Sequence, residues 1–306
     1  MQALSLDSSD GAVLAARLYP SDGEGIRGAA LIGGEGIKGA VVIGGAMGVR
    51  QDYYAPFAQW LAAQGFAVLT FDYRGMGDSR LPVHTKSLRG LDADLFAWAR
   101  DYDTAIDALR AAAPGVPLYL IGHSLGAQLP GLLRNRDRIE GLLSVAAGSG
   151  YWRDNAPPLK RIVLYFWHVL VPVATAVCGY FPGKRIGKVG DLPRGVILQW
   201  RRWCMDPRYL VDAEGDVVRA QFEQVRFPVV ALSITDDELM TERGTHVLID
   251  SYANAPRRVE RVAPVDVDVQ RIGHFGFFRE QFQSSLWARS VALLQGFQTT
   301  PTEMTA

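Results

Sequence analysis

The sequence predicts an α/β fold in which a mostly parallel central sheet is covered by helices on both faces. Short apolar runs alternate with longer amphipathic stretches along most of the chain, which is the order expected when each strand is followed by a helix that returns to the sheet. In addition, 306 residues of which 48% are hydrophobic can bury one large core, or one core with an inserted subdomain.

The elements before residue 150 follow from periodicity and from turn residues. Apolar runs predict six strands, at residues 3–6, 12–20, 40–45, 66–75, 117–124 and 140–148. Helical patterns follow three of these strands, at residues 54–65, 92–113 and 125–139. The run that leads to Ser124 lies between Pro117 and Gly122, as expected for a buried parallel strand.

The pattern changes near Tyr151, where an aromatic, basic and proline-rich segment without strand alternation begins. The alternation of strand and helix patterns resumes after this segment. It predicts a seventh strand at 228–237, a helix at 242–255, a strand at 257–264 and a final helix at 284–297. We therefore expect one core, formed by residues 1–150 and 217–306, and a helical cap of residues 151–216 inserted between the sixth and seventh strands.

One short repeat precedes the third strand. Residues 24–34 (EGIRGAALIGG) are nearly copied by residues 35–45 (EGIKGAVVIGG). Two copies are too few for a solenoid, so a local duplication of one strand and its approach turn is the simpler interpretation. Because only the second copy runs into the following helix, we expect the first to form an extra loop or an edge strand.

Charge and cysteine content exclude several kinds of partner. The chain carries 32 basic and 32 acidic residues, with no basic block interleaved with aromatics, so a nucleic acid partner is not expected. Cys178 and Cys204 are too few for a disulfide framework and lack metal-site spacing. The first residues carry no secretory signal pattern, and we expect a cytoplasmic protein.

One segment tests that expectation. Residues 162–181 (IVLYFWHVLVPVATAVCGYF) are long enough to cross a bilayer and have basic residues at both flanks. His168, Pro172 and Gly179 interrupt the run, and the segment lies between strands that belong to one sheet. A soluble cap is therefore the preferred interpretation, and membrane association is the alternative.

The chemistry is predicted to centre on Ser124, in Gly122-His123-Ser124-Leu125-Gly126. This matches the G-x-S-x-G nucleophile elbow, a sharp strand-to-helix turn that lifts the serine hydroxyl clear of the sheet. The turn needs glycines because strained backbone and close packing leave little room for Cβ atoms.

A serine hydroxyl needs a base to take its proton, and the base needs a carboxylate to hold it in one tautomer. Of five histidines, only His274 lies between the last strand and the last helix, where the Ser-acid-His order of this fold places it. His123 is expected to point away from the serine hydroxyl, while His84, His168 and His246 are interpreted as surface, cap and packing residues.

Three carboxylates compete for the position of the acid, because Asp236, Asp237 and Glu238 follow the seventh strand in succession. Adjacent aspartates point in different directions, so one can face the histidine while its neighbour caps a turn. We favour Asp237, with Asp236 as the alternative and Glu238 third. This preference rests on a resemblance, because the sequence Asp-Glu-Leu-Met-Thr resembles the acid loop of homoserine acetyltransferase-type proteins.

The negative charge that develops on a substrate oxygen requires two preorganised N–H donors. We expect one to be the amide of Leu125 and the other to be that of Ala46 or Met47, in the glycine-rich turn Gly44–Gly48. No metal or cofactor is expected, because these donors polarise the substrate carbonyl as a metal would.

A third glycine-rich turn, residues 72–79 (DYRGMGDS), completes a resemblance. Together with GHSLG and the late GHFGFF, it resembles the α/β-hydrolase superfamily, over residues 40–297 without the insertion. The resemblance implies that Arg74, Gly75 and Gly77 brace the turn beside the elbow without a chemical step. Departures from the usual pattern are Gly44 and Gly45 in place of His-Gly, and Ser233 and Thr241 where glycine and proline often flank the acid.

The predicted function is cleavage of a carboxylic ester or thioester with a hydrophobic portion, through an acyl-Ser124 intermediate. The apolar cap favours a small-molecule acyl substrate, and Arg194, Arg201 and Arg202 either meet an anionic leaving group or are solvated. Two alternatives remain: acyl transfer to an alcohol or thiol by the same triad, and a non-catalytic or membrane-associated binding protein with the same fold. The sequence does not indicate an oligomeric state.

Overall fold

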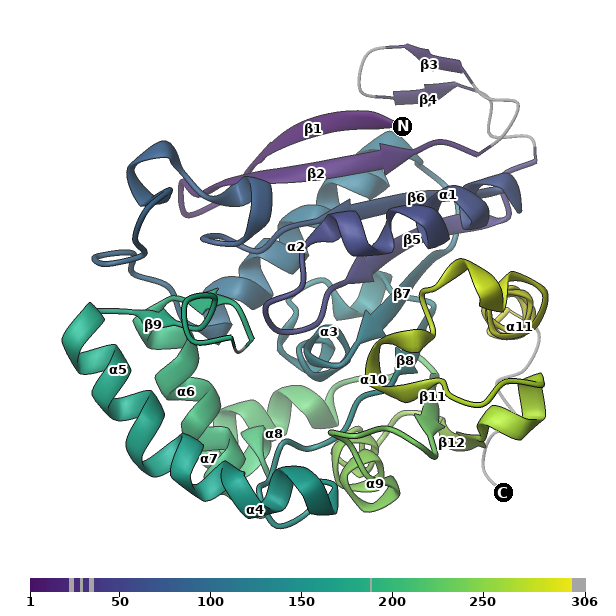
Figure 1. Ribbon diagram of the computed structural model, residues 1–306. Coiled ribbons are helices and arrows are strands. Elements are labelled where there is room, and N and C mark those ends of the chain that lie inside the picture. Colours follow the sequence, from purple (N-terminus) through teal and green to yellow (C-terminus); the bar gives the residue numbers. More distant parts are fainter. Residues whose placement is uncertain (22–24, 28–29, 33–35, 188, 299–306) are drawn as a thin grey trace.

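The computed structural model describes residues 1–21, 25–27, 30–32, 36–187 and 189–298. Its central element is an eight-stranded sheet (Figure 1). In spatial order the strands are β1 (Gln2–Asp7), β2 (Val13–Tyr19), β6 (Phe66–Phe71), β5 (Gly39–Gly44), β7 (Leu118–His123), β8 (Gly141–Val145), β11 (Val229–Ile234) and β12 (Arg257–Val262).

The sheet is mostly parallel, as predicted. From β6 through β12 each neighbouring pair is parallel, while β1 pairs with β2 and β2 with β6 in antiparallel register. All residues of β5, β6, β7, β8 and β11 are buried, which explains why their sequences are continuous apolar runs rather than alternating ones. Parallel strands also bring their carboxyl ends to one edge, where the functional residues lie.

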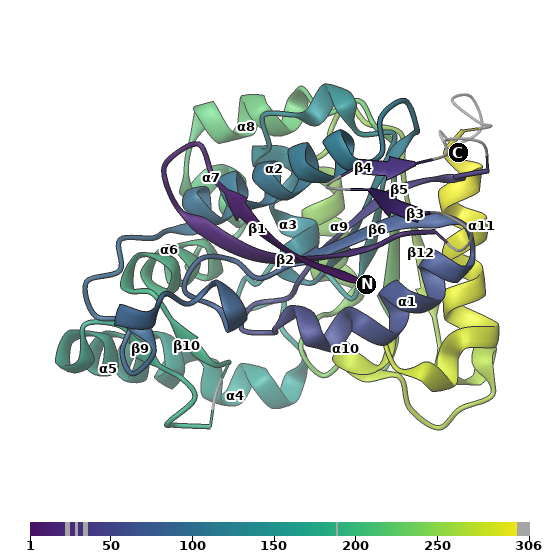
Figure 2. The same cartoon turned by 90° about the horizontal axis from the view of Figure 1, so that it is seen from above.

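Helices cover both faces of this sheet (Figure 2). One face packs against α1 (Ala55–Ala63) and α11 (Ala288–Gly296). The other packs against α2 (Leu95–Ala112), α3 (Leu125–Gln128), α8 (Asp216–Glu223) and α9 (Glu242–Asp250). Asp94 caps α2 by accepting the amide of Ala97 at 2.7 Å, which satisfies one of the free N–H groups of the first turn.

The segment between β8 and β11 is helical. It holds α4 (Pro157–Tyr165), α5 (Val171–Cys178), α6 (Arg194–Met205) and α7 (Leu210–Ala213), with the small strand pair β9 (Phe181–Pro182) and β10 (Asp191–Leu192). In both views α5 and α6 lie on the side of the molecule opposite α11 (Figures 1 and 2). Helix α8 begins at the last residue of the predicted cap, and its Phe222 packs against Tyr252 of the core.

Two predicted elements differ from the structure. The helix expected at 125–139 ends after one turn at Gln128 and continues as 3-10 turns at Pro130–Leu132 and Arg136–Arg138, because Pro130 has no N–H to donate and its ring clashes with the preceding turn. Within the described residues of the first repeat copy, β3 (Gly25–Arg27) and β4 (Ala30–Ile32) form a separate hairpin outside the central sheet. Residues 24, 28–29 and 33–34 of that copy lie outside the described residues.

Candidate active site

Ser124 lies at the turn between β7 and α3, in a conformation rarely adopted by residues with a side chain. Its φ is 51° and its ψ is −111°, and such a backbone persists only where its surroundings enforce it. A Cβ atom at Gly126 would lie 2.0 Å from the carbonyl oxygen of Gly44, and one at Gly122 would lie 2.5 Å from the amide nitrogen of Ala127. The flanking glycines are therefore required sterically, and Ser124 remains partly accessible, with 7% of its surface exposed.

The carboxylate that reaches the imidazole of His274 is that of Asp237. Its Oδ2 lies 2.8 Å from His274 Nδ1, and both side chains are almost completely buried. Its other oxygen, Oδ1, accepts the amides of Leu239 and Met240 at 2.7 and 2.8 Å. Because Nδ1 donates to the carboxylate, Nε2 of the neutral ring is left as the basic atom.

The two neighbouring carboxylates hold the backbone that carries His274. Asp236 accepts the amides of Ile272 and Gly273, each at 3.0 Å, and Glu238 Oε2 accepts the amide of His274 at 3.0 Å. Burial opposes ionisation of Glu238, but this amide and the nearby Arg271 outweigh burial and lower its pKa. All three consecutive acids thus bind one loop, and Asp236 does not contact the imidazole.

A chain of hydrogen bonds joins the elbow, the glycine-rich turn and the histidine loop. His123 Nε2 donates to the carbonyl oxygen of His274 at 3.0 Å, and its Nδ1 accepts the hydroxyl of Tyr54 at 2.9 Å. The rings of His123 and His274 have centroids 5.2 Å apart, so the His274 ring lies beside the elbow. Within the described residues, the Ser124 hydroxyl forms no hydrogen bond. Hydrogen bonds between catalytic groups often tighten only when substrate is bound.

These hydrogen bonds also show which of the two predicted donors in the glycine-rich turn is available. The amide of Ala46 donates to the hydroxyl of Tyr54 at 2.8 Å, so it is already committed. The amides of Met47 and Leu125 donate to no protein atom in the part of the chain that the structure describes. Of the predicted set, these two N–H groups are therefore the available ones.

The turn after β6 is braced by charges, as the resemblance implied. Arg74 pairs with Asp101 at 2.6 Å and with Asp10 at 2.8 Å. Burial raises the pKa of Asp101 to about 6, against the opposing effect of Arg74. A Cβ atom at Gly77 would lie 2.1 Å from Asp72 Oδ2, because that carboxylate accepts the amide of Asp78 across the turn.

An apolar cavity of about 160 Å³ lies between the loop that carries Asp237 and the helical segment between β8 and β11, which is the predicted cap. Leu239 and Met240, whose amides bind Asp237, form one wall. On another side is Val189, whose carbonyl oxygen approaches Gly48 of the glycine-rich turn. The remaining lining comes mainly from cap residues, including Leu159, Ile162, Val163, Phe166, Trp167 and Trp200.

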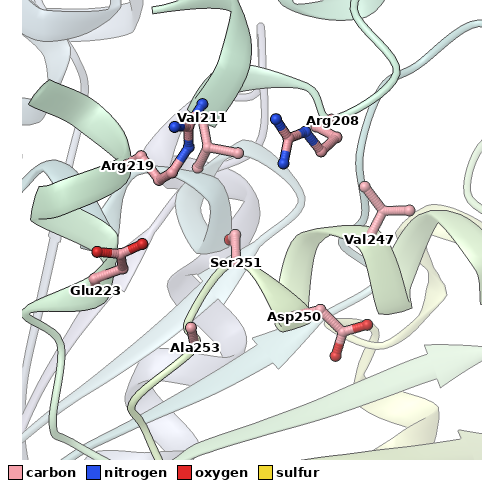
Figure 3. A pocket seen from close by; sticks show the side chains of 8 residues that line it. All are labelled: Arg208, Val211, Arg219, Glu223, Val247, Asp250, Ser251 and Ala253. Carbon is pink, nitrogen blue, oxygen red and sulfur yellow. The ribbon is translucent and has the colours of Figure 1, made fainter. Parts of the chain in front are cut away.

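A second hollow, of about 340 Å³, lies between α7, α8 and α9 and contains none of the predicted site residues (Figure 3). Its two arginines already form ion pairs, Arg208 with Asp212 and Arg219 with both Asp212 and Asp216. The hollow therefore offers no unpaired arginine to a ligand.

Other sequence interpretations are corrected or refined by the structure. His246, interpreted as a packing residue, is exposed on the outer side of α9. Arg201 donates to the carbonyl oxygen of Trp167 at 2.6 Å, and Arg202 pairs with Glu214, so neither is free to meet a leaving group. Tyr54 had no predicted role. Its position at the start of α1, shortly after the glycine-rich turn, is the sequence feature that could have indicated a contact with that turn.

Sheet order, helices on both faces and the strained serine turn at the carboxyl edge together define an α/β-hydrolase. More specifically, the chain belongs to the family described as serine aminopeptidase, S33, whose sequence pattern matches residues 35–188, about half of the chain.

Comparison with curated proteins adds a local match. A stretch of 75 residues is 37% identical to the lysophosphatidylserine lipase ABHD12 of Rattus norvegicus. It covers 24% of this chain and 16% of that protein, so the chain matches only a small part of this relative.

Solved structures resemble the whole chain in fold. A soluble variant of monoglyceride lipase from Saccharomyces cerevisiae, in complex with a substrate analog, has a TM-score of 0.66 at 14% identity, covering 98% of this chain and 95% of that one. Est1E from Butyrivibrio proteoclasticus with bound ferulic acid has a TM-score of 0.58 at 15% identity, covering 97% and 100%. Est816, described as an N-acyl homoserine lactone degrading enzyme, has a TM-score of 0.56 at 18% identity, covering 96% and 100%.

Proposed function

We propose that this protein is a serine hydrolase that cleaves a carboxylic ester or thioester through an acyl-Ser124 intermediate. The observation that carries the proposal is the buried Asp237–His274 pair, whose imidazole ring is centred 5.2 Å from the ring of His123, the residue directly before the strained and partly accessible Ser124. A carboxylate on Nδ1 leaves Nε2 basic and holds the ring in one orientation, which is what activation of a serine hydroxyl requires.

The reaction proceeds in two halves. Nε2 of His274 takes the proton of Ser124 as its oxygen attacks the substrate carbonyl, and the negative charge moves to the carbonyl oxygen, facing the amides of Leu125 and Met47. The imidazolium returns its proton to the leaving alcohol or thiol, which departs as the acyl-serine forms. Water then repeats the sequence, releasing the acid and restoring the serine.

The cavity beside the acid loop supplies the hydrophobic part of the substrate site. At about 160 Å³ it is close in size to the roughly 150 Å³ apolar cavities that take up benzene, so it fits a short acyl chain or a single ring. The names of similar proteins support this substrate class, since they include a monoglyceride lipase, Est1E with bound ferulic acid and a lysophosphatidylserine lipase.

The test is a panel of esters of graded acyl length, together with labelling by a fluorophosphonate probe. Wild-type protein should turn over the shorter esters and take up the probe on Ser124. Ser124→Ala should lose roughly a hundredfold or more of kcat and all labelling. Retention of both by a folded Ser124→Ala variant would contradict the proposal. Added acceptor alcohols distinguish acyl transfer, since new esters form in that case.

A further inference from the structure

The helical segment Leu159–Cys178 of the cap is apolar on two sides. It runs through α4, a π-helical turn at Phe166–Leu170 and α5, and only 22% of its most apolar 18 residues are buried. By length and composition it is the one helix among the described residues that could cross a membrane. A core helix of a soluble protein can be equally long and apolar but is mostly buried, whereas this helix is mostly exposed.

The inner side of the helix is fixed to the protein. Its buried residues recur every four positions, at Val163, Trp167, Val171 and Thr175, which forms one stripe along a helix. Arg201 donates to the carbonyl oxygen of Trp167, and Arg89 donates to those of Val177 and Cys178. A bilayer-spanning orientation would break this packing and these hydrogen bonds, so the helix remains on the cap.

The outer side exposes large aliphatic and aromatic side chains. They are Ile162, Leu164, Tyr165, Val169, Val173 and Val177. No Asp, Glu, Lys or Arg lies between Ile162 and Cys178, and the exposed side chains there that carry an ionisable group are Tyr165 and His168. A contiguous exposed apolar surface of this kind on a soluble fold marks a site of association.

The charges around the helix indicate which kind of partner it meets. Although the chain as a whole is neutral, residues 155–190 contain five basic residues and no acidic one. Four of the five, Lys160, Arg161, Lys184 and Arg185, are described and exposed, and their side chains form no ion pair within the described residues. An apolar stripe bordered by unpaired cations is complementary to an anionic lipid surface, in which apolar side chains enter the acyl boundary and cations meet the headgroups.

We propose that the outer side of Leu159–Cys178 lies in the plane of an anionic lipid surface, without spanning it. Ile162 and Phe166 also line the apolar cavity. The same helix would therefore hold the cavity next to the lipid surface, so that a hydrophobic substrate could pass from the lipid into the cavity. Docking itself involves no catalysis, so the proposal goes beyond the function proposed above and can be tested without turnover.

The experiment measures flotation of the full chain, carrying Ser124→Ala so that ester lipids stay intact, with vesicles of two compositions. One is phosphatidylcholine alone, and the other contains phosphatidylserine at about one part in three. Binding is expected to the second composition, with little to the first, and to weaken as salt is raised. Val173→Ser/Val177→Ser should lower the partition constant about tenfold or more, because the exposed apolar area is lost.

A matched control exists elsewhere on the surface. Val173 and Val177 are 58% and 71% exposed, and Val217 and Val265 are 72% and 77% exposed but lie outside the helix. The pair Val217→Ser/Val265→Ser should bind vesicles as the parent does. Circular dichroism and the melting temperature of both pairs establish that they fold.

Four outcomes would overturn the proposal. The parent could fail to float with either vesicle, or both valine pairs could lower binding equally. The parent could also resist extraction by alkaline carbonate, which would indicate a span. If the parent is a dimer without lipid and Val173→Ser/Val177→Ser is a monomer, the surface belongs to a second copy of the chain, and the lipid proposal is again wrong. Each outcome leaves the ester assay of wild-type protein unaffected.

Discussion

Glu238 accepts the backbone N–H of His274 at 3.0 Å, one residue beyond the acid that accepts the imidazole of the same histidine. The loop that carries His274 is thus held at its backbone and at its ring from one short segment. Glu238 binds the backbone of His274, whereas the ring of His274 is bound by Asp237, so we interpret Glu238 as a positioning residue.

Replacement of Glu238 tests this role. Glu238→Ala should lower kcat about tenfold with little change in KM, because a mispositioned base weakens the transition state more than binding. Glu238→Gln should recover most of the activity, since its amide oxygen can still accept the N–H of His274. Steady-state kinetics on one ester decides it, and equal losses in both variants would show that the charge matters instead.

The two aspartates before Glu238 should differ sharply in importance. Asp237→Asn should lower kcat by about a thousandfold or more, because an amide no longer holds the tautomer with a basic Nε2. Asp236→Asn keeps one of the two oxygens that accept the amides of Ile272 and Gly273. Because neither oxygen contacts the imidazole, we expect less than about a tenfold loss. Comparable losses in the two variants would contradict the assignment of Asp237.

His123 makes the stability of the fold depend on pH. Burial lowers the pKa of His123 well below its usual value, whereas in the unfolded chain it titrates near about 6.5. Below that pH the unfolded chain binds a proton that the folded protein does not, so stability is full above the unfolded pKa and is lost as pH falls.

The expected slope is about 1.4 kcal/mol per pH unit from this one group. His123→Gln cannot titrate but can still donate to His274 and accept from Tyr54. Urea unfolding at a series of pH values below 6.5 should give a pH slope smaller by about that amount in the variant. An unchanged slope would mean that His123 carries its proton in the folded state as well.

The size of the cap cavity should set the preferred acyl length. Phe166 lines the cavity, and Phe166→Ala enlarges it, so kcat/KM for a long-chain ester relative to a short-chain one should rise about tenfold. Tyr165→Ala is the matched control, because Tyr165 lies on the outer side of the same helix and does not line the cavity. A shift in both variants would place the acyl chain elsewhere.

Several parts of the site were predictable because they depend on local sequence. The pattern of Gly122, Ser124 and Gly126 predicts a sharp turn, because only small flanking residues permit it. The order of Ser124, the acid and His274 along the chain follows from the order of the predicted strands. Location in the cytoplasm and the division into core and cap stay predictions. Of residues 162–181, which were expected to pack as part of a soluble cap, only the inner side of the helix is packed against the protein.

Other parts depend on atoms that are distant in sequence. The sequence limits the acid to Asp236, Asp237 or Glu238 and the second donor to Ala46 or Met47, because each group shares one loop and one chemistry. The tertiary structure distinguishes them. Asp237 meets the ring of His274, and Tyr54 takes the amide of Ala46, since packing of α1 and of the histidine loop fixes which way each group points.

The sequence by itself determined the order of most strands and helices along the chain, the position of the serine turn and the types of residue at the site. These features depend on local periodicity and backbone sterics, which act over a few residues. Only the tertiary structure decided which carboxylate binds the histidine, which amide remains available and which side of the cap helix is left exposed. Those outcomes depend on directions of side chains brought together from opposite ends of the chain, which no local pattern encodes.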